Sequence, residues 1–102
     1  MIRFCLLGSG SSGNAILVTS ANAKVLIDNG LSFKQLCLRT EEVGESLDGL
    51  QAAFVTHEHI DHVHGIGTLA RRLKIPVYVT DKTYQNFPPK IGALPDVRHF
   101  EA

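Results

Sequence analysis

The sequence predicts a mixed α/β fold in one small domain. Three short segments in the first half, 2–7, 15–19 and 24–28, are rich in apolar and β-branched residues and are predicted to be strands. A four-residue turn at 20–23 joins the second and third strands and suits a hairpin. The rest of the chain alternates helical spacing with short apolar strands, and this order of elements is typical of a mixed class. A length of 102 residues suits one domain.

A helix is predicted to follow the third strand. Ser32 has Gln35 three residues after it, which is the capping-box pattern of a helix N-terminus. Gly44 can end this helix, because glycine readily adopts the left-handed conformation of a helix C-terminus. Residues 51–56 are then predicted to form a further, largely buried strand.

The second half continues the alternation of helix and strand. Apolar residues repeat at helical spacing over 62–73, and residues 77–80 read as the next strand. Asp81 is a candidate N-cap for a short helix that reaches Phe87, where two prolines stop it. The tail, 88–102, is predicted to be loose and to contain no closing element. An end within the alternation suggests a fragment.

Composition excludes several classes of protein. The chain is 44% hydrophobic and 20% charged, which is ordinary for a globular domain and unlike disordered or collagen-like chains. Ten basic side chains balance ten acidic ones, so no overall charge attracts nucleic acid or anionic membrane. A small basic cluster, Arg71, Arg72 and Lys74, is interpreted as a helix end, where positive charge complements the helix dipole.

The two cysteines and the lack of long apolar runs suggest a cytoplasmic protein. Cys5 and Cys37 are far apart, form no C-x-x-C pair and have apolar neighbours, so we expect buried free thiols. No run approaches the length of a membrane span, and the N-terminus leads directly into strand-like sequence.

A glycine- and serine-rich loop, Gly8 to Gly13, matches the pattern G-x-G-x-x-G, and Asp28 follows Gly8 by twenty residues. A dinucleotide-binding turn must open into a helix, however, and 14–19 is strand-like. The loop also lacks the Lys and Ser/Thr of a P-loop. It is therefore interpreted as a tight crossing between strands, in which the serines and Asn14 satisfy backbone groups, and a role in lining the floor of an active site is the alternative.

Four of the five histidines lie between positions 57 and 64. His57 and His59 are two residues apart, so both rings project to one side of an extended chain and suit one metal ion. Asp61 and His62 follow at the turn into a helix, where they can face a second ion. Imidazole nitrogens and a carboxylate oxygen suit zinc, manganese or iron. Two such ions can clamp both the attacking and the leaving oxygen of an ester.

Other residues near this cluster receive different interpretations. The alternative that the cluster is merely a solvated helix N-terminus is weak, because four ligand-type residues occur in the order H-x-H-x-D-H. His64 lies outside the pattern and is expected to be an exposed helical residue, and Glu58 is expected to point away from the metals. Gly65 and Gly67 place no side chains at the start of the helix, which would let the backbone approach the metals.

At this point the chain resembles the metallo-β-lactamase superfamily, whose signature H-x-H-x-D-H-x-x-G appears as His57 to Gly65. The segments 4–14, 26–32 and 55–59 look like the YycJ (WalJ) branch, which is similar to the nucleases of the superfamily. This resemblance covers essentially the whole chain. It implies that residues 1–102 are a partial domain, the N-terminal half of a four-layer αββα sandwich with two metals at one edge of the sheets.

The resemblance also implies a role for each site residue. His57 and His59 would bind the first divalent ion, and Asp61 and His62 the second, zinc being the expected metal. Asp61 would in addition help to orient the attacking water, as the catalytic residue. Asp28 matches an aspartate that supports the metals from behind, although an aspartate that merely ends a strand in a turn is the alternative.

The chain departs from the family mainly in length. The family's fold needs a longer chain, with a later histidine for the first metal, a bridging aspartate and a final histidine for the second. His99 is the only remaining histidine and is not assigned, because the next ligand should arrive after a further strand and helix. Asn29 stands where the branch has a small residue, which is a minor departure.

The function expected from this resemblance is a dinuclear metal-dependent hydrolase, a phosphodiesterase or exonuclease acting on nucleic acid. A thioester or lactone hydrolase is the alternative within the enzymes, since the same loop supports carbonyl chemistry. A truncated, non-catalytic metal-binding module is the alternative outside them, and the isolated chain is expected to be incomplete and inactive. Exposed apolar sheet surface on half a sandwich would favour a homodimer.

Overall fold

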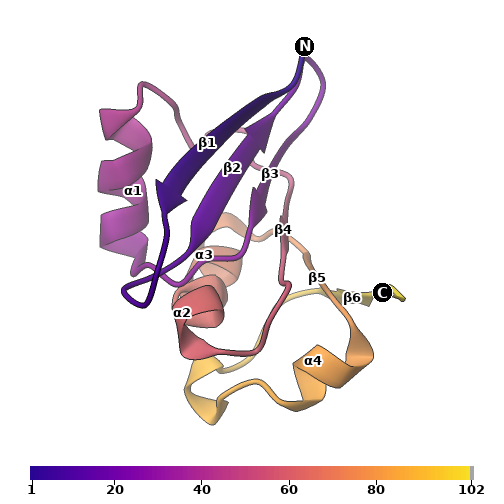
Figure 1. Cartoon of the computed structure of the whole chain (residues 1–102). Helices are drawn as coiled ribbons and strands as arrows, with labels where there is room; N and C mark the ends of the chain where they lie inside the picture. Colours follow the sequence, from indigo (N-terminus) through magenta and orange to yellow (C-terminus); the bar gives the residue numbers. More distant parts are fainter. Residues whose placement is uncertain (102) are drawn as a thin grey trace.

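The structure is a computed structural model that describes residues 1–101, with a six-stranded sheet at its centre. Its strands are β1 (Arg3–Gly8), β2 (Ala15–Thr19), β3 (Lys24–Ile27), β4 (Ala52–Phe54), β5 (Val77–Val79) and β6 (Val97–His99). They lie side by side in chain order (Figure 1). The first three pair antiparallel, and β3 to β6 pair parallel. The predicted mixed α/β class is confirmed.

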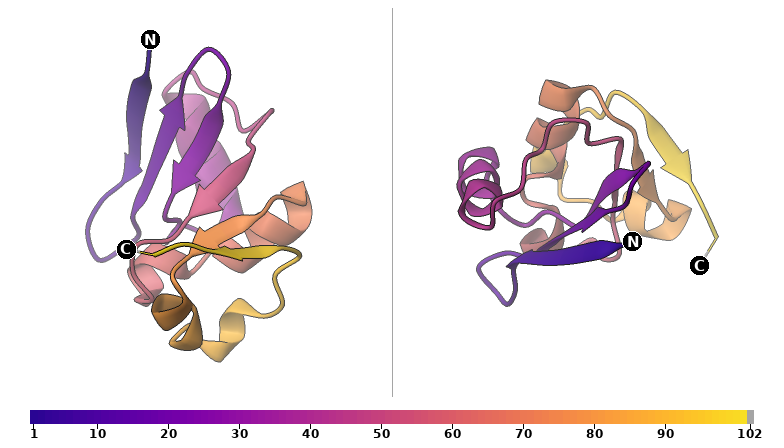
Figure 2. Two further views of the ribbon diagram at one scale, coloured as in Figure 1. Left: turned by 90° about the vertical axis from the view of Figure 1, so that its right-hand side faces the viewer. Right: turned by 90° about the horizontal axis from the view of Figure 1, so that it is seen from above.

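Helices connect the parallel strands. They are α1 (Phe33–Glu42), α2 (Ile60–Val63), α3 (Ile66–Leu73), α4 (Asp81–Gln85) and the 3-10 turn η1 (Pro89–Ile91). Along the chain, α1 lies between β3 and β4, α2 and α3 between β4 and β5, and α4 and η1 between β5 and β6. Two perpendicular views show α1 and α3 on the same side of the sheet (Figure 2). Because β3 and β4 run parallel, the loops that follow them emerge at one edge.

The start and end of α1 agree with the capping signals in the sequence. The Ser32 hydroxyl accepts a hydrogen bond from the backbone N–H of Gln35 at 3.2 Å. At the other end Gly44 has a φ of +74°, and the next residue, Glu45, donates its N–H to the Thr40 carbonyl at 3.0 Å. This is the Schellman arrangement, which satisfies carbonyls that the helix leaves free.

The hydrophobic core lies between the sheet and its helices. Leu17 and Leu26, at the centre of the sheet, are fully buried, and so are Leu36 of α1 and Ile66 and Leu69 of α3. Each such side chain contributes about 1.5–3 kcal/mol through its removal from water. The core therefore holds α1, α3 and the sheet together, and with them the loops between β3, β4 and α3.

The opposite face of the sheet is also apolar, and none of the helices within residues 1–101 covers it (Figure 2). One row of paired residues crosses it from strand to strand: Leu6, Ile16, Ile27, Phe54, Tyr78 and Arg98. On β1 of this face, Phe4 is 71% exposed and Leu6 is 61% exposed. Contiguous exposed apolar surface of this kind commonly marks an interaction site. We refer to it as the open sheet face.

Arg98 ends this row with a charge at the rim of the open sheet face. Its guanidinium forms an ion pair with Asp96 at 2.9 Å and donates a hydrogen bond to the Tyr78 hydroxyl at 2.9 Å. Both contacts, chiefly that with Asp96, raise the pKa of Arg98 above its usual value. The Tyr78 ring stacks on Phe54 with a centroid separation of 4.7 Å. The row is thus apolar as far as Tyr78 on β5 and ends on β6 in a charge that Asp96 pairs.

Three predictions for the second half were wrong. The single helix predicted over 62–73 is two helices, because the N–H of Gly65 donates to the carbonyl of Asn29 at 2.9 Å instead of continuing the α2 helix. The N-cap of α4 is Thr80, whose hydroxyl accepts from the Thr83 N–H at 3.2 Å, and Asp81 is the first helical residue. The same helix ends at Gln85, before the predicted Phe87.

The tail also contains two elements that the sequence did not predict, η1 and β6. Val97 pairs with Val77 and His99 with Val79, so β6 extends the sheet by a sixth strand. Three residues are too few for a strand periodicity to show, and two of these three are polar. Residue 102, the last of the predicted loose tail, lies outside the described residues.

Candidate metal centre

The candidate site lies where β3 and β4 end. Asp28 directly follows β3, and Thr56 and His57 follow β4 after one more residue. These strands pair in parallel, so residues that are 28 positions apart in sequence meet at one edge of the sheet. The carboxyl ends of parallel strands are the usual place for ligand sites in such sheets. His62 reaches the same edge from α2.

Asp28 is the buried centre of this group, with 6% of its surface exposed. Its Oδ1 accepts from the Thr56 N–H at 2.7 Å, and its Oδ2 accepts from the Thr56 hydroxyl at 2.5 Å. The same Oδ2 lies 2.8 Å from Nδ1 of His62. Asp28 has a φ of +62°, an uncommon conformation that aspartate tolerates better than most residues. Its carboxylate therefore faces the histidine loop from behind, where it contacts His62.

The rings of His57 and His62 lie beside one another, with centroids 4.7 Å apart. Together with Asp28 they place one potential ligand atom each within 4.8 Å of the others, the one such group that residues 1–101 contain. Asp28 also holds Nδ1 of His62, which leaves Nε2 as the free nitrogen of that ring. The structure thus brings two of the predicted ligands together with the predicted supporting aspartate.

The other two predicted ligands lie next to this group. The ring of His59 is 6.1 Å from that of His57, centroid to centroid, and is exposed. Oδ2 of Asp61 lies 3.8 Å from Nε2 of His62. Two donors that share one zinc ion at tetrahedral angles lie about 3.3–3.5 Å apart, given bonds of about 2.0–2.2 Å. The oxygen of Asp61 and the free nitrogen of His62 therefore fit one ion with little movement.

Three residues that were not assigned as ligands are outside the group of Asp28, His57 and His62. His64 is exposed, as expected, and Glu58 is half-buried. His99 lies on β6, where its Nδ1 is 3.1 Å from the Val79 carbonyl and its Nε2 is 3.9 Å from Asp81. It has no contact with the other histidines among the interactions of the described residues.

Asn14 satisfies backbone groups of the glycine loop, as predicted, and it also contacts Asp61, which was not predicted. Its backbone N–H and side-chain Nδ2 donate to the Asp61 carbonyl at 2.7 and 3.1 Å. Nδ2 also donates to Oδ2 of Asp61 at 3.2 Å. Through its side chain Asn14 bonds both backbone groups of Gly10, at 3.1 and 3.0 Å. The glycine loop therefore enters β2 and positions Asp61, rather than opening a nucleotide-binding helix.

Two glycines allow the loops of the site to pack closely. A Cβ on Gly30 would overlap the backbone carbonyl oxygen of Asp61, and a Cβ on Gly65 would overlap that of Leu31. Gly67 approaches the Ile91 carbonyl in the same manner. The sequence interpretation expected Gly65 and Gly67 to admit the backbone to the metals. The close approach is instead between backbone segments, which fixes the histidine loop against residues 29–31.

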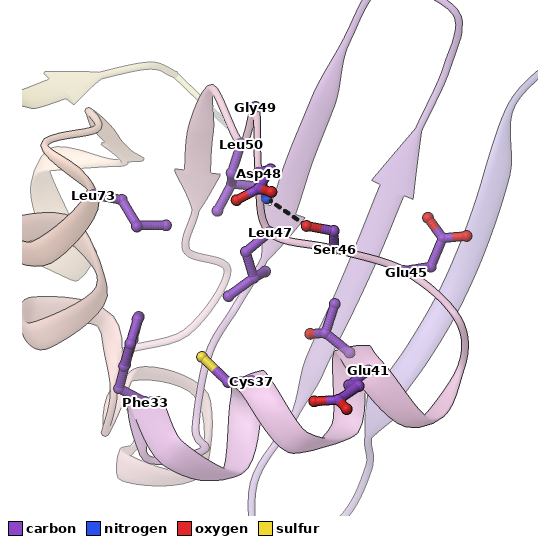
Figure 3. A pocket seen from close by; sticks show the side chains of 11 residues that line it. Phe33, Cys37, Glu41, Glu45, Ser46, Leu47, Asp48, Gly49, Leu50 and Leu73 are labelled. Atoms are coloured by element: carbon purple, nitrogen blue, oxygen red, sulfur yellow. Dashed lines mark hydrogen bonds between the residues drawn. The ribbon is translucent and has the colours of Figure 1, made fainter.

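A separate hollow of about 520 Å³ lies between α1, the segment 45–50 and α3 (Figure 3). Its lining is apolar near Phe33, Leu47 and Leu73 and acidic near Glu41. None of the histidines or of their hydrogen-bonded partners lines it.

Within residues 1–101, no helix has the length and apolar character needed to cross a membrane.

Comparison with known proteins agrees with this geometry. Residues 8–101 match the metallo-beta-lactamase superfamily. The chain is 40% identical over 83 residues to the exodeoxyribonuclease WalJ of Streptococcus pneumoniae, a match that covers 81% of this chain and 31% of that protein. It is 36% identical over 99 residues to the exodeoxyribonuclease YycJ of Bacillus anthracis, covering 97% of this chain and 38% of that protein.

Solved structures show the same arrangement of the backbone. A metallo-beta-lactamase of Cronobacter sakazakii superposes with a TM-score of 0.77 at 20% identity, over 96% of this chain and 44% of that one. The metallo-beta-lactamase SMB-1 superposes with a TM-score of 0.74 at 20% identity, over 96% and 43%. The chain thus spans less than half the length of each of these proteins. On its sequence match and its fold, the chain belongs to the metallo-β-lactamase superfamily.

Proposed function

We propose that the chain carries part of a dinuclear, metal-dependent phosphodiesterase site that acts on DNA. The observation that supports this most is the cluster of Asp28, His57 and His62 at the carboxyl ends of two parallel strands. The DNA part of the proposal is supported by the names of the two relatives, both exodeoxyribonucleases.

In this proposal His57 and His59 hold one divalent ion, and Asp61 and His62 hold the other. Zinc is the expected metal, with manganese or iron as alternatives. Ions bound there would supply Lewis-acid stabilisation to a phosphodiester and lower the pKa of water. Asp61 orients the attacking water through its carboxylate, while the amide of Asn14 holds that carboxylate from the glycine loop. Asp28 orients the ring of His62 from behind.

We further propose that residues 1–102 are a partial domain. The relatives are about two and a half to three times as long as the matched segment, in keeping with the shares of 31% and 38%. The remaining metal ligands and the residues that select the substrate would then belong to sequence beyond the matched part. On this view the isolated chain binds metal with an incomplete set of ligands and turns over little or no substrate.

The test compares this chain with a version extended at its C-terminus by the following segment of a curated relative. We expect both proteins to bind zinc or manganese, and only the extended one to cleave DNA and a small phosphodiester. A chelator should abolish that cleavage. Equal inactivity of the two proteins, each with metal bound, would contradict the enzyme proposal. Cleavage of a thioester or lactone without cleavage of the phosphodiester would favour the alternative substrate class.

The open sheet face leads to a further expectation for the isolated chain, that two copies associate through it. The row of paired residues that crosses this face is apolar except for Arg98, and the charge of Arg98 is paired with Asp96. Burial of the Phe4 side chain and burial of the Leu6 side chain would each stabilise the dimer by about 1.5–3 kcal/mol. The double variant Phe4→Glu/Leu6→Lys should therefore raise the dimer Kd at least tenfold, by the ~1.4 kcal/mol that a factor of ten requires.

Sedimentation velocity over a range of concentrations measures this effect. Leu38→Lys is the matched control, because Leu38 is 44% exposed on α1, away from the sheet. We expect the control to associate as the unaltered chain does. A chain that stays monomeric at high concentration, or a double variant with an unchanged Kd, would rule out association through this face.

A further inference from the structure

Thr56 connects the buried carboxylate of Asp28 to the ring of His57. Its hydroxyl oxygen lies 2.5 Å from Oδ2 of Asp28 and 2.9 Å from Nδ1 of His57. Its backbone N–H also donates to Oδ1 of Asp28, at 2.7 Å. The hydroxyl is thus held between a carboxylate oxygen and a ring nitrogen that can either donate or accept a hydrogen bond.

Counting protons decides the direction of these hydrogen bonds. Ionised Asp28 can only accept, so the single hydroxyl proton of Thr56 must point to Oδ2, the nearer of its two neighbours. The hydroxyl oxygen then offers only lone pairs to His57. A hydrogen bond at 2.9 Å therefore requires that Nδ1 of His57 carries the proton and donates it. If the Thr56 hydroxyl donated its proton to His57 instead, a lone pair of Thr56 would face a lone pair of Asp28.

The same carboxylate acts on the second histidine directly. Oδ2 of Asp28 lies 2.8 Å from Nδ1 of His62 and requires a proton on that nitrogen as well. Asp28 consequently directs the proton to Nδ1 in both rings. It acts on His57 through Thr56 and on His62 directly. Both rings then present an unprotonated Nε2, which is the form of imidazole that coordinates a metal.

We infer that Thr56 is a positioning residue that fixes the neutral tautomer of His57, with the proton on Nδ1, and so prepares its Nε2 as a metal ligand. The tautomer itself does not depend on the proposed function, whereas its use in metal binding does. The side chain of free histidine in water favours the proton on Nε2, so the Thr56 contact has to reverse an intrinsic preference. This makes the tautomer of His57 a sensitive readout of the hydroxyl.

The experiment measures the tautomers of the histidines in the metal-free chain by long-range ¹H–¹⁵N correlation spectroscopy, at a pH of about 8.5. In the unaltered chain we expect both His57 and His62 in the Nδ1–H form. Thr56→Val removes the hydroxyl and keeps the shape, and should move His57 toward the Nε2–H form. His62 should stay unchanged, because Asp28 still accepts from it. Thr56→Ser should restore the pattern of the unaltered chain.

Thr40→Val is the matched control, because Thr40 is a buried threonine whose hydroxyl donates to the Leu36 carbonyl within α1 at 2.7 Å. It removes a hydroxyl without touching the site, so both histidines should keep their tautomers. The unchanged His62 signal in Thr56→Val shows that the loop remains folded. His57 in the Nε2–H form in the unaltered chain, or in the Nδ1–H form in Thr56→Val, would overturn the inference.

Zinc titration of the same proteins distinguishes this inference from the proposed function. Partners behind a metal ligand typically affect affinity by about 10–100-fold, and we expect a loss in that range for Thr56→Val and recovery in Thr56→Ser. An unaltered chain that shows the expected tautomers but takes up no zinc would contradict the proposed metal site and leave the tautomer assignment standing. Zinc uptake by a chain whose His57 carries its proton on Nε2 when metal-free would support the metal site and overturn the tautomer inference.

Discussion

The double variant His57→Ala/His59→Ala is expected to lose metal uptake. It removes both imidazole ligands of the first proposed ion. The second ion, held by Asp61 and His62, then lacks the first ion beside it. Changes to residues behind a ligand already cost about 10–100-fold in affinity, so loss of two ligands should weaken binding by at least ~100-fold. Metal content after dialysis, measured by mass spectrometry, and titration against a chelating dye give the stoichiometry and the affinity.

A pair of histidines outside the group provides the control. His64 is exposed, and His99 lies on β6 beside Asp81. His64→Ala/His99→Ala removes as many imidazoles and should retain metal at the level of the unaltered chain. Both altered positions of the first variant are also exposed, so its stability should change by only about 0.5 kcal/mol. Equal metal content in the two variants would refute the ligand assignment.

The substitution Gly65→Ala is expected to have the largest effect on stability. Its Cβ would overlap the Leu31 carbonyl oxygen and press on Nδ2 of Asn29, an amide that is fully buried. Both obstacles belong to a tightly packed segment, because the Asn29 N–H is held by the His62 carbonyl at 2.8 Å. Such overpacking typically costs about 1–3 kcal/mol, and we expect the upper end of that range.

Chemical unfolding in urea measures this loss against Gly44→Ala. Gly44 has open space around it and a φ of +74°, so alanine there meets only backbone strain, at a cost of about 1–2 kcal/mol. Gly65 has a φ of −99°, so alanine at that position meets only the steric overlap. A Gly65→Ala variant no less stable than Gly44→Ala would show that the segment 29–31 can move, and that the histidine loop does not depend on it.

The strongest parts of the sequence interpretation rest on local signals. Ser32 and Gly44 bound α1 because capping depends on residues within one turn of the helix end. The order of His57, Asp61 and His62 indicated a metal site from spacing alone. The short strand β6 was not predicted, because it depends on pairing with β5. The helix break at Gly65 was not predicted either, because it depends on contacts with residues 29–31.

Asn14 and Thr56 show why two supporting residues of the site, unlike Asp28, were not predicted. In the sequence each is an ordinary polar residue at the end of a strand, where polar residues are common. Their partners are distant: Asn14 bonds Asp61, 47 positions along the chain, and Thr56 bonds Asp28, 28 positions back. Only the parallel pairing of β3 with β4 and the crossing of the glycine loop bring these atoms together.

The sequence by itself determined the mixed α/β class, the location of the histidine cluster and the residue types that it offers to a metal. These follow from side-chain periodicity and from donor chemistry, which are properties of short segments. The tertiary structure decided which nitrogen of each ring is free, because that depends on where the buried carboxylate of Asp28 lies. It also decided that one apolar face of the sheet stays uncovered, since burial depends on which elements pack together.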